Sequence, residues 1–336
     1  MARRPPPIVV TRTPLRLSFA GGGTDIADFY ERGYGAVLST TITSYIYVTV
    51  KSHSPLFNEP IRLNYSQSEN VNTVDEIENH IARECLRFLD IDPPIYISTI
   101  GDHPASSGLG GSSSFAVGLL HALHTYRGER VSAGQLAEEA AHIEIDVLGW
   151  PIGKQDQYAA AFGGMNLFIF EPGGTVTLQP ERLSSAAVQA LFGSLLLFYT
   201  GHQRDARAVL AEQSVNTHEK EQALVKMREH ARELHTLFVN GKVDLARFGR
   251  TLDESWRLKR TLATTISSTQ IDSWYQRALD AGAHGGKLCG AGGGGCLLFA
   301  VEKTLHERVR AALSSLMVVP IAYEAHGSRV LVPLEY

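Results

Sequence analysis

The stretch PASSGLGGSSS, residues 104–114, limits more than any other what this chain can fold into. Its glycines and small residues form a turn in which backbone N–H groups can converge on an anion. The run FAVGLLHALHTY that follows has the length and apolar content of a buried helix. Unpaired amides and the positive end of the dipole at a helix N-terminus both favour a bound phosphate. The stretch therefore predicts a phosphate-binding loop, although a loop of this composition can also simply cap an ordinary helix.

The chain has 336 residues, more than a single hydrophobic core usually serves, so we expect two domains. Residues 180–193 carry little pattern, which predicts an N-terminal domain over 1–190 and a C-terminal domain over 191–336. Hydrophobic residues make up 44% of the chain and charged residues 20%, as in ordinary globular proteins. The net charge of −4, with Lys and Arg scattered, argues against nucleic acid as a partner.

The absence of a recognisable signal peptide or membrane-spanning run, together with the cysteine spacing, leads us to expect a cytoplasmic protein. The N-terminus MARRPPPIVVTRT is no signal peptide, because Thr11 and Arg12 interrupt its short apolar run. No apolar run is long enough to span a bilayer, so we expect no membrane partner. Cys85, Cys289 and Cys296 lack close CxxC spacing, which indicates neither a disulfide framework nor a zinc site and fits a reducing compartment.

Runs of β-branched residues and helical spacing of apolar residues predict an α+β fold. In the first half we expect strands at 8–20, 36–50, 61–65, 95–100, 165–170 and 175–179, and helices at 25–32, 73–89, 115–126, 132–147 and 154–162. In the second half we expect strands at 195–199, 296–301, 317–323 and 328–333, and helices around 204–239, 243–262, 269–281 and 303–315.

Two common nucleotide motifs are excluded. Residues 290–295, GAGGGG, satisfy GxGxxG, but the segment after them, CLLFAVE, is typical of a strand, whereas a dinucleotide site needs a helix there. No Gly-Lys pair precedes Ser or Thr, so the chain has no Walker P-loop.

Three glycine loops remain, at 21–23, 108–111 and 290–295, together with the segment GKQDQY at 153–158. In this combination the chain resembles the GHMP superfamily, named for galactokinase, homoserine kinase, mevalonate kinase and phosphomevalonate kinase. PLRLSFAGGGTD looks like its first motif, PASSGLGGSSS like its ATP-binding motif and GAGGGG like its third, while GKQDQY is similar to the segment that bears the catalytic aspartate in galactokinases. The resemblance runs from about residue 12 to 335 and implies two α+β domains, the first ribosomal-protein-like and the second ferredoxin-like, with the active site between them.

Phosphoryl transfer needs positioned phosphates, a metal ion that bridges them, and a group that orients or deprotonates the attacking hydroxyl. The resemblance implies ATP and Mg²⁺ as cofactors, with Ser112 and Glu144 as hard oxygen ligands for the metal. Without the motifs, Glu144 would be interpreted as a solvated helix residue. The residues implied to bind ATP are Pro104, Ser106, Ser107, Gly108, Leu109, Gly110, Gly111, Ser112 and Ser113.

The resemblance also implies the catalytic pair. Asp156 would accept the proton of the substrate hydroxyl, and Arg16 would keep its carboxylate ionised, since an adjacent cation lowers a carboxyl pKa. The structural alternatives are a helix cap for Asp156 and an ion pair on a strand face for Arg16.

The implied substrate-binding residues are Gly22, Gly23, Thr24, Asp25, Lys154, Gly292 and Gly293. Thr24 or Asp25 can instead cap a short helix, and the third glycine loop can be a tight turn. A substrate that carries its own phosphate needs a basic site for it, for which Lys154, Lys287 and Arg329 are candidates.

Within the superfamily, the GGGTD and KLCGAGGGG forms look most like the bacterial heptose 7-phosphate kinases of surface-polysaccharide precursor synthesis. The chain departs from galactokinase, which has Glu-His at the position of Gly22-Gly23. We therefore expect a sugar kinase that phosphorylates the anomeric hydroxyl of D-glycero-D-manno-heptose 7-phosphate, a small-molecule sugar phosphate. The alternatives are a kinase for fucose or galactose, and a non-catalytic sensor of ATP and sugar. Whether the chain forms a homodimer stays open.

Overall fold

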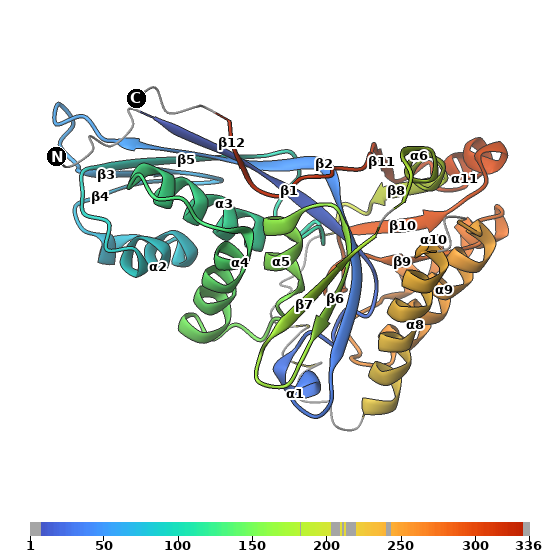
Figure 1. Cartoon of the computed structure of the whole chain (residues 1–336). Coiled ribbons are helices and arrows are strands. Elements are labelled where there is room, and N and C mark those ends of the chain that lie inside the picture. Colours follow the sequence, from blue (N-terminus) through green and yellow to red (C-terminus); the bar gives the residue numbers. More distant parts are fainter. Residues whose placement is uncertain are drawn as a thin grey trace.

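The computed structural model describes residues 8–181, 183–202, 209, 212, 220–239 and 243–331. Two β-sheets form its framework, each with helices packed on it (Figure 1). The fold belongs to the α+β class, as expected from the sequence.

The first sheet is antiparallel except for one parallel pair, β3 with β5. Its strand order is β12-β1-β2-β5-β3-β4, with β6 beside β2 and β7 beside β6. The strands are β1 (Val9–Ala20), β2 (Gly35–Ser52), β3 (Ile61–Asn64), β4 (Ser68–Val71), β5 (Ile95–Gly101), β6 (Met165–Phe170), β7 (Val176–Pro180) and β12 (Arg329–Val330). The long β2 joins two regions of this sheet, because its first residues pair with β6 and its last residues pair with β5.

The helices of the first half are α1 (Ala27–Tyr30), the 3₁₀ turn η1 (Val74–Glu76), α2 (His80–Phe88), α3 (Gly111–Tyr126), α4 (Ala133–Ala141), the π-helical turn η2 (His142–Val147) and α5 (Gln155–Phe162). Helices α3 and α5 pack directly on the first sheet, and α2 and α4 pack on α3. Helix α3 packs on β1 and β2 and is buried along most of its length, as its apolar sequence predicts. Ser132 caps α4 by accepting a hydrogen bond from Gln135 N.

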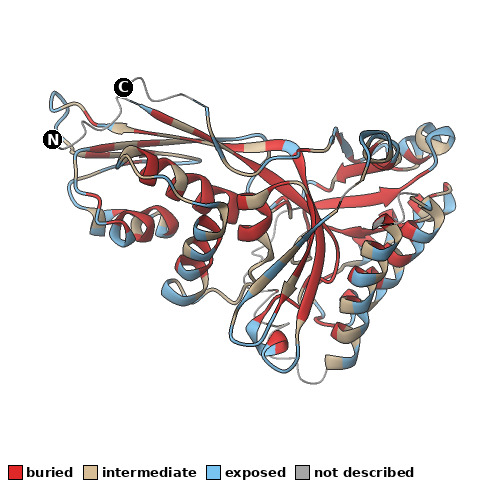
Figure 2. Ribbon diagram, viewed as in Figure 1, coloured by how far each residue is buried: buried red, intermediate tan, exposed pale blue. Residues whose placement is uncertain are grey.

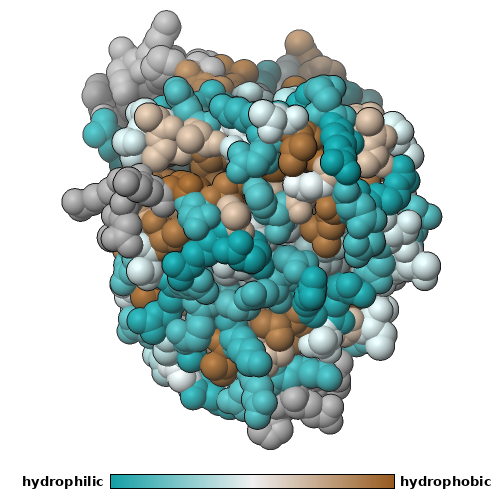
Figure 3. Space-filling model, turned by 90° about the vertical axis from the view of Figure 1, so that its right-hand side faces the viewer, coloured by the Kyte–Doolittle hydropathy of each residue, from teal (hydrophilic) through white to brown (hydrophobic). Residues whose placement is uncertain are grey.

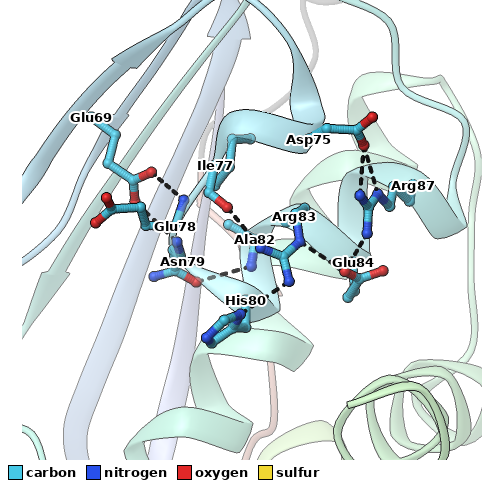
Figure 4. Close-up of polar contacts among 10 residues, drawn as sticks. All are labelled: Glu69, Asp75, Ile77, Glu78, Asn79, His80, Ala82, Arg83, Glu84 and Arg87. Atoms are coloured by element: carbon cyan, nitrogen blue, oxygen red, sulfur yellow. Dashed lines mark hydrogen bonds and ion pairs between the residues drawn. The ribbon is translucent and has the colours of Figure 1, made fainter.

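The single helix expected over 73–89 is wrong, because the chain forms η1 and then α2 with an extended turn between them (Figure 4). The carboxylate of Glu69 on β4 accepts hydrogen bonds from the backbone N–H groups of Glu78, at 2.6 Å, and Asn79, at 3.1 Å. The Asn79 side chain then caps α2 by accepting from Ala82 N. A carboxylate from a neighbouring strand therefore takes the donors that a continuous helix would have used internally.

The second sheet is antiparallel, with the order β11-β8-β10-β9. Its strands are β8 (Leu195–Tyr199), β9 (Gly285–Leu288), β10 (Cys296–Ala300) and β11 (Met317–Val319). The helices of this half are α6 (Ser185–Phe192), α8 (Glu221–Val239), α9 (Leu245–Arg260), α10 (Thr269–Asp280), the 3₁₀ turn η3 (Lys303–Leu305) and α11 (His306–Ala312). This strand order is that of a ferredoxin-like βαββαβ unit. Of the helix expected over 204–239, the residues before 220 lie outside the described part of the chain, apart from 209 and 212.

The end of the described chain returns to the first sheet. β12 pairs with β1 through Thr11 and Arg12, and Tyr323 bridges to Ile42 on β2. Of the strand expected over 328–333, residues 332 and 333 lie outside the described part. The domain boundary at 190/191 stays a prediction, and the segment from about 320 to 331 contacts the first sheet rather than the second.

Buried residues concentrate on the strands of both sheets and on the helix faces turned toward them (Figure 2). On the face that Figure 3 shows, hydrophilic residues predominate, and hydrophobic residues occur in small groups between them. Within the described residues, no helix has both the length and the apolar character needed to cross a membrane.

Candidate active site between the two sheets

A cavity of 670 Å³ lies where the three glycine loops and the start of α5 meet. The predicted residues that line it are Arg16, Gly22, Gly23, Asp25, Pro104, Ser106, Ser107, Gly108, Gly110, Gly111, Ser112, Ser113 and Asp156. The residues of the second half that line it are Lys259, Lys287, Gly290 and Ala291, so residues from both halves of the chain form one site.

Arg16 on β1 and Asp156 in the first turn of α5 form a two-pronged ion pair. The guanidinium donates from Nε to Oδ1 and from Nη2 to Oδ2, both at 2.6 Å. Its third group, Nη1, donates to the carbonyl of Gly108 at 2.7 Å. Arg16 is 4% exposed, whereas 23% of the Asp156 side chain is exposed, so the carboxylate is the member of the pair that a substrate can reach.

Asp25 holds the start of α5 in place. Its carboxylate accepts hydrogen bonds from Gly23 N, from Gln155 N and from the Gln155 side chain. Burial raises the pKa of Asp25, and the hydrogen bond from Gly23 N opposes this. Neither Thr24 nor Asp25 caps α1, whose N-cap is Ile26 without a side-chain bond. Asp25 instead acts as the cap of α5, the helix that carries Asp156.

The phosphate-binding loop has the backbone geometry that its glycines predict. Gly108 and Gly110 both have φ of +80°, in the left-handed region where a side chain is strained, and Gly110 is the N-cap of α3. A Cβ on Gly111 would meet no atom within 4 Å, so the first turn of α3 faces open space in the cavity. Free amides at the start of a long helix, beside an open space, fit the phosphates of a nucleotide.

The third glycine loop packs against the phosphate-binding loop, backbone to backbone. A Cβ on Gly290 would lie 2.6 Å from the Cα of Gly108, and one on Gly295 would lie 2.5 Å from the carbonyl oxygen of Ser107. Glycine is therefore required for the two loops to approach this closely. Gly292 and Gly293 do not line the cavity, because they pack against Ile266.

Glu144 lies in the π-helical turn η2 and is fully buried. Its Oε2 accepts a hydrogen bond from Gln157 at 2.6 Å, whereas Oε1 has no hydrogen-bond partner among the described residues. Burial raises the pKa of this carboxyl to about 7, while Ser113, Gln157 and Ser112 act to lower it. A buried carboxylate oxygen without a partner, beside two hydroxyls at the start of α3, fits a Mg²⁺ ion that takes its remaining ligands from phosphates and water.

The geometry does not support substrate contact by Thr24, Lys154 or Arg329. The Thr24 hydroxyl is buried and bonds to the carbonyls of Gly21 and Ala36. Lys154 Nζ points away from the cavity, to Gly174 O at 3.1 Å and Glu138 at 3.7 Å. Arg329 is exposed on β12. Leu109 is buried behind the loop, where its carbonyl accepts from Arg16 N.

Sequence reasoning missed Lys259 on α9 and named Lys287 on β9 only as a weak candidate. Both line the cavity, with 7% and 5% of their surfaces exposed. Lys259 follows Phe248, Leu252 and Trp256 along the buried stripe of its helix. A lysine on an apolar stripe is the signal that would have revealed it.

Comparisons with known proteins agree with this geometry. The family model described as GHMP kinases N terminal domain matches residues 72–164, and that described as GHMP kinases C terminal matches residues 239–319. A D-glycero-alpha-D-manno-heptose 7-phosphate kinase of Campylobacter jejuni is 31% identical, over 88% of this chain and 89% of that protein. A galactokinase of Pyrococcus furiosus is 27% identical over the same shares. Among solved structures, a D-glycero-D-manno-heptose 1-phosphate kinase from Bacteroides thetaiotaomicron superimposes with a TM-score of 0.78 at 27% identity, covering 97% of this chain and 99% of that one.

Proposed function

The chain is a member of the GHMP kinase family, and we propose that it phosphorylates the anomeric hydroxyl of D-glycero-D-manno-heptose 7-phosphate to give the 1,7-bisphosphate. As a family member it is an ATP-dependent phosphotransferase that acts on a sugar. The observation that carries the proposal is the Arg16–Asp156 pair. The carboxylate of Asp156 lines the same cavity as the N-terminus of α3, where phosphates can bind. Two relatives named for a phosphorylated heptose support the choice of substrate.

Asp156 accepts the proton of the anomeric hydroxyl. The oxygen of that hydroxyl attacks the γ-phosphorus of ATP and displaces ADP. The two hydrogen bonds from Arg16 fix the orientation of the carboxylate. A general base of this kind contributes about 10²–10⁴ in rate. Asp25 supports the same step at one remove, because it anchors the first turn of α5.

The amides at the start of α3, with the loop from Ser106 to Gly110, bind the phosphates of ATP. Glu144 and Ser112 would hold Mg²⁺, which neutralises charge on the phosphates of the nucleotide when bound. On the acceptor side, Gly22, Gly23 and Asp25 line the cavity and face the sugar.

Substrate specificity tests this proposal directly. The purified protein with MgATP is assayed against heptose 7-phosphate, heptose 1-phosphate, unphosphorylated heptose, galactose and fucose, and the product is identified by ³¹P NMR. We expect the fastest turnover with heptose 7-phosphate and a new anomeric phosphate. Faster turnover of heptose 1-phosphate or of an unphosphorylated sugar would refute the substrate, and ATP binding without turnover of any sugar would favour a sensor.

The product would supply nucleotide-activated heptose for surface polysaccharide. This role rests on the same substrate, so the assay above tests it as well.

A further inference from the structure

Two buried lysines in the cavity wall have no anionic partner among the described residues. Lys259 Nζ donates to the carbonyl of Gly290. Lys287 Nζ donates to the carbonyls of Ser18, at 2.5 Å, and Phe19, at 3.3 Å. Within the described part of the chain, neither ammonium forms a salt bridge, in contrast to the neighbouring Arg16.

Burying a cation without a counter-charge lowers the stability of the fold. Burial, with the charge of Arg16, lowers the pKa of Lys259 to about 8. Burial, with the charges of Lys259 and Arg16, lowers the pKa of Lys287 to about 7. The hydrogen bonds to backbone carbonyls offset part of this cost, but they supply no counter-charge. Buried charges without a partner are typical of a site that a ligand completes.

The two lysines reach the cavity from the half of the chain that does not hold the nucleotide loop. Lys287 lies beneath Ser18 and Phe19, which lead directly into the Gly21–Asp25 segment on the acceptor side. The amides that serve the ATP phosphates come instead from the start of α3. The cavity therefore has one anion site at the helix and a second concentration of positive charge at Lys259 and Lys287.

We propose that Lys259 and Lys287 together bind the phosphate group that the sugar substrate already carries. The proposal rests on the proposed function, in which the acceptor is a sugar phosphate. A dianion placed between two ammonium groups supplies the missing counter-charge and fixes the far end of the sugar while its anomeric hydroxyl faces Asp156. Part of this binding energy can serve the rate as well as affinity.

The first test compares Lys259→Met and Lys287→Met with the wild type on heptose 7-phosphate and on unphosphorylated heptose. Loss of a charged contact to a buried phosphate costs about 2–5 kcal/mol, so kcat/KM for the phosphorylated sugar should fall by a factor of about 30 or more. The constants for unphosphorylated heptose and the KM for ATP should stay within a few-fold. Lys226→Met, which changes an exposed lysine on α8, is the matched control.

Several outcomes would overturn the assignment. An equal loss with both sugars, or a raised KM for ATP, would mean that the lysines serve the transferring phosphoryl group. If Lys154→Met lost the preference for the phosphorylated sugar while Lys259→Met and Lys287→Met kept it, Lys154 would be the residue that binds the substrate phosphate.

A second measurement does not depend on knowing the sugar. With the nucleotide site filled by a non-hydrolysable ATP analogue and Mg²⁺, inorganic phosphate is titrated into the wild type and the double variant Lys259→Met/Lys287→Met by calorimetry. We expect binding to the wild type and at least a tenfold loss in the variant, whereas equal binding would refute the site. If the wild type binds phosphate through the lysines but prefers a sugar phosphate other than heptose 7-phosphate, the substrate is wrong and this inference stands. A wild type that prefers unphosphorylated sugars overturns both.

Discussion

The guanidinium of Arg16 and the carboxylate of Asp156 meet through two hydrogen bonds of 2.6 Å, although 140 residues of sequence separate them. β1 and α5 bring the two residues together, and the buried Arg16 is further tied to the phosphate-binding loop through Gly108 O. Arg16 therefore contacts both the carboxylate of Asp156 and the phosphate-binding loop. This side chain fixes the position of the base relative to the loop.

The first prediction concerns the base itself. Asp156→Asn should lower kcat by about 10²–10⁴, because the amide fills the same volume but cannot accept the proton. Affinity for ATP, measured by calorimetry, should stay within a few-fold. Asp75→Asn, which changes an exposed carboxylate paired with Arg87, serves as the control. Turnover near the wild-type rate would remove Asp156 from this role.

The second prediction separates the charge of Arg16 from its geometry. Arg16→Lys keeps a cation but cannot make the two parallel bonds, so kcat should fall, and the free energy of unfolding should fall less than in Arg16→Met because the charge is retained. Arg16→Met leaves Asp156 without its partner and should lower the free energy of unfolding by about 3 kcal/mol. Urea unfolding of Arg16→Met, Asp156→Asn and the double variant measures the coupling. Additive effects would contradict a direct interaction.

How far the sequence predicts this site depends on where each interaction originates. The phosphate-binding loop at 104–114 is predicted from its own residues, whereas the roles of Arg16 and Asp156 are predicted from the resemblance of two separate motifs to those of the GHMP kinases. Thr24, in the turn before α1, and Lys154, the N-cap of α5, are adjacent in sequence to site residues, but their side chains bond to backbone carbonyls away from the cavity. Proximity along the chain is a poor guide to which of two neighbours faces a cavity.

Other features depend on distant partners. The break before α2 requires Glu69, a residue on another element, and no local pattern announces that contact. Only the three-dimensional structure shows that, among the described residues, no carboxylate forms a salt bridge with Lys259 or Lys287. Such features are set by tertiary contacts, which override local preferences.

The third prediction tests the phosphate-binding loop without damaging the fold. Gly111→Val should leave the Tm unchanged, since its Cβ meets no atom within 4 Å, but the side chain should block the approach of phosphate and weaken ATP binding at least tenfold. Gly110 is a poorer choice, because its φ is +80° and a Cβ there would lie 3.1 Å from an Arg16 carbon, which would confound folding with binding.

Gly134→Val on α4 is the matched control, because this glycine lies outside the cavity lining and its Cβ would make only ordinary contacts. Normal ATP affinity in Gly111→Val would place the phosphates elsewhere.

The fourth prediction concerns the unpartnered oxygen of Glu144. Glu144→Gln removes a ligand charge, so the Mg²⁺ concentration for half-maximal activity should rise at least about tenfold, since loss of even outer partners of a metal site costs about 10–100-fold. The Tm should not fall, because the variant buries a neutral amide in place of a carboxylate that burial disfavours. Glu181→Gln is the control outside the cavity, because one oxygen of Glu181 is likewise buried without a partner in the described part of the chain, while the other contacts His235. An unchanged Mg²⁺ requirement would exclude Glu144 as a ligand.

The last prediction concerns stability and pH at His124 on α3. Its ring contacts Glu129 through Nδ1 at 2.6 Å and Glu139 through Nε2 at 2.7 Å, and only the imidazolium can donate to both. Burial acts to lower the pKa of His124, but the bonds to Glu139 and Glu129 outweigh it and raise the pKa above its ordinary value. The resulting stabilisation is therefore complete below a pH of about 6.5 and is lost as the pH rises through the raised pKa.

His124→Gln should consequently cost more free energy of unfolding at pH 6 than at pH 9, as measured by urea denaturation of variant and wild type in parallel. Titrations elsewhere in the protein cancel in this difference. The neighbouring His121 does not interfere, since burial and His124 lower its pKa to about 4 and it stays neutral throughout the window. A cost that is independent of pH would show that His124 is neutral in the folded protein and that packing alone accounts for its contribution.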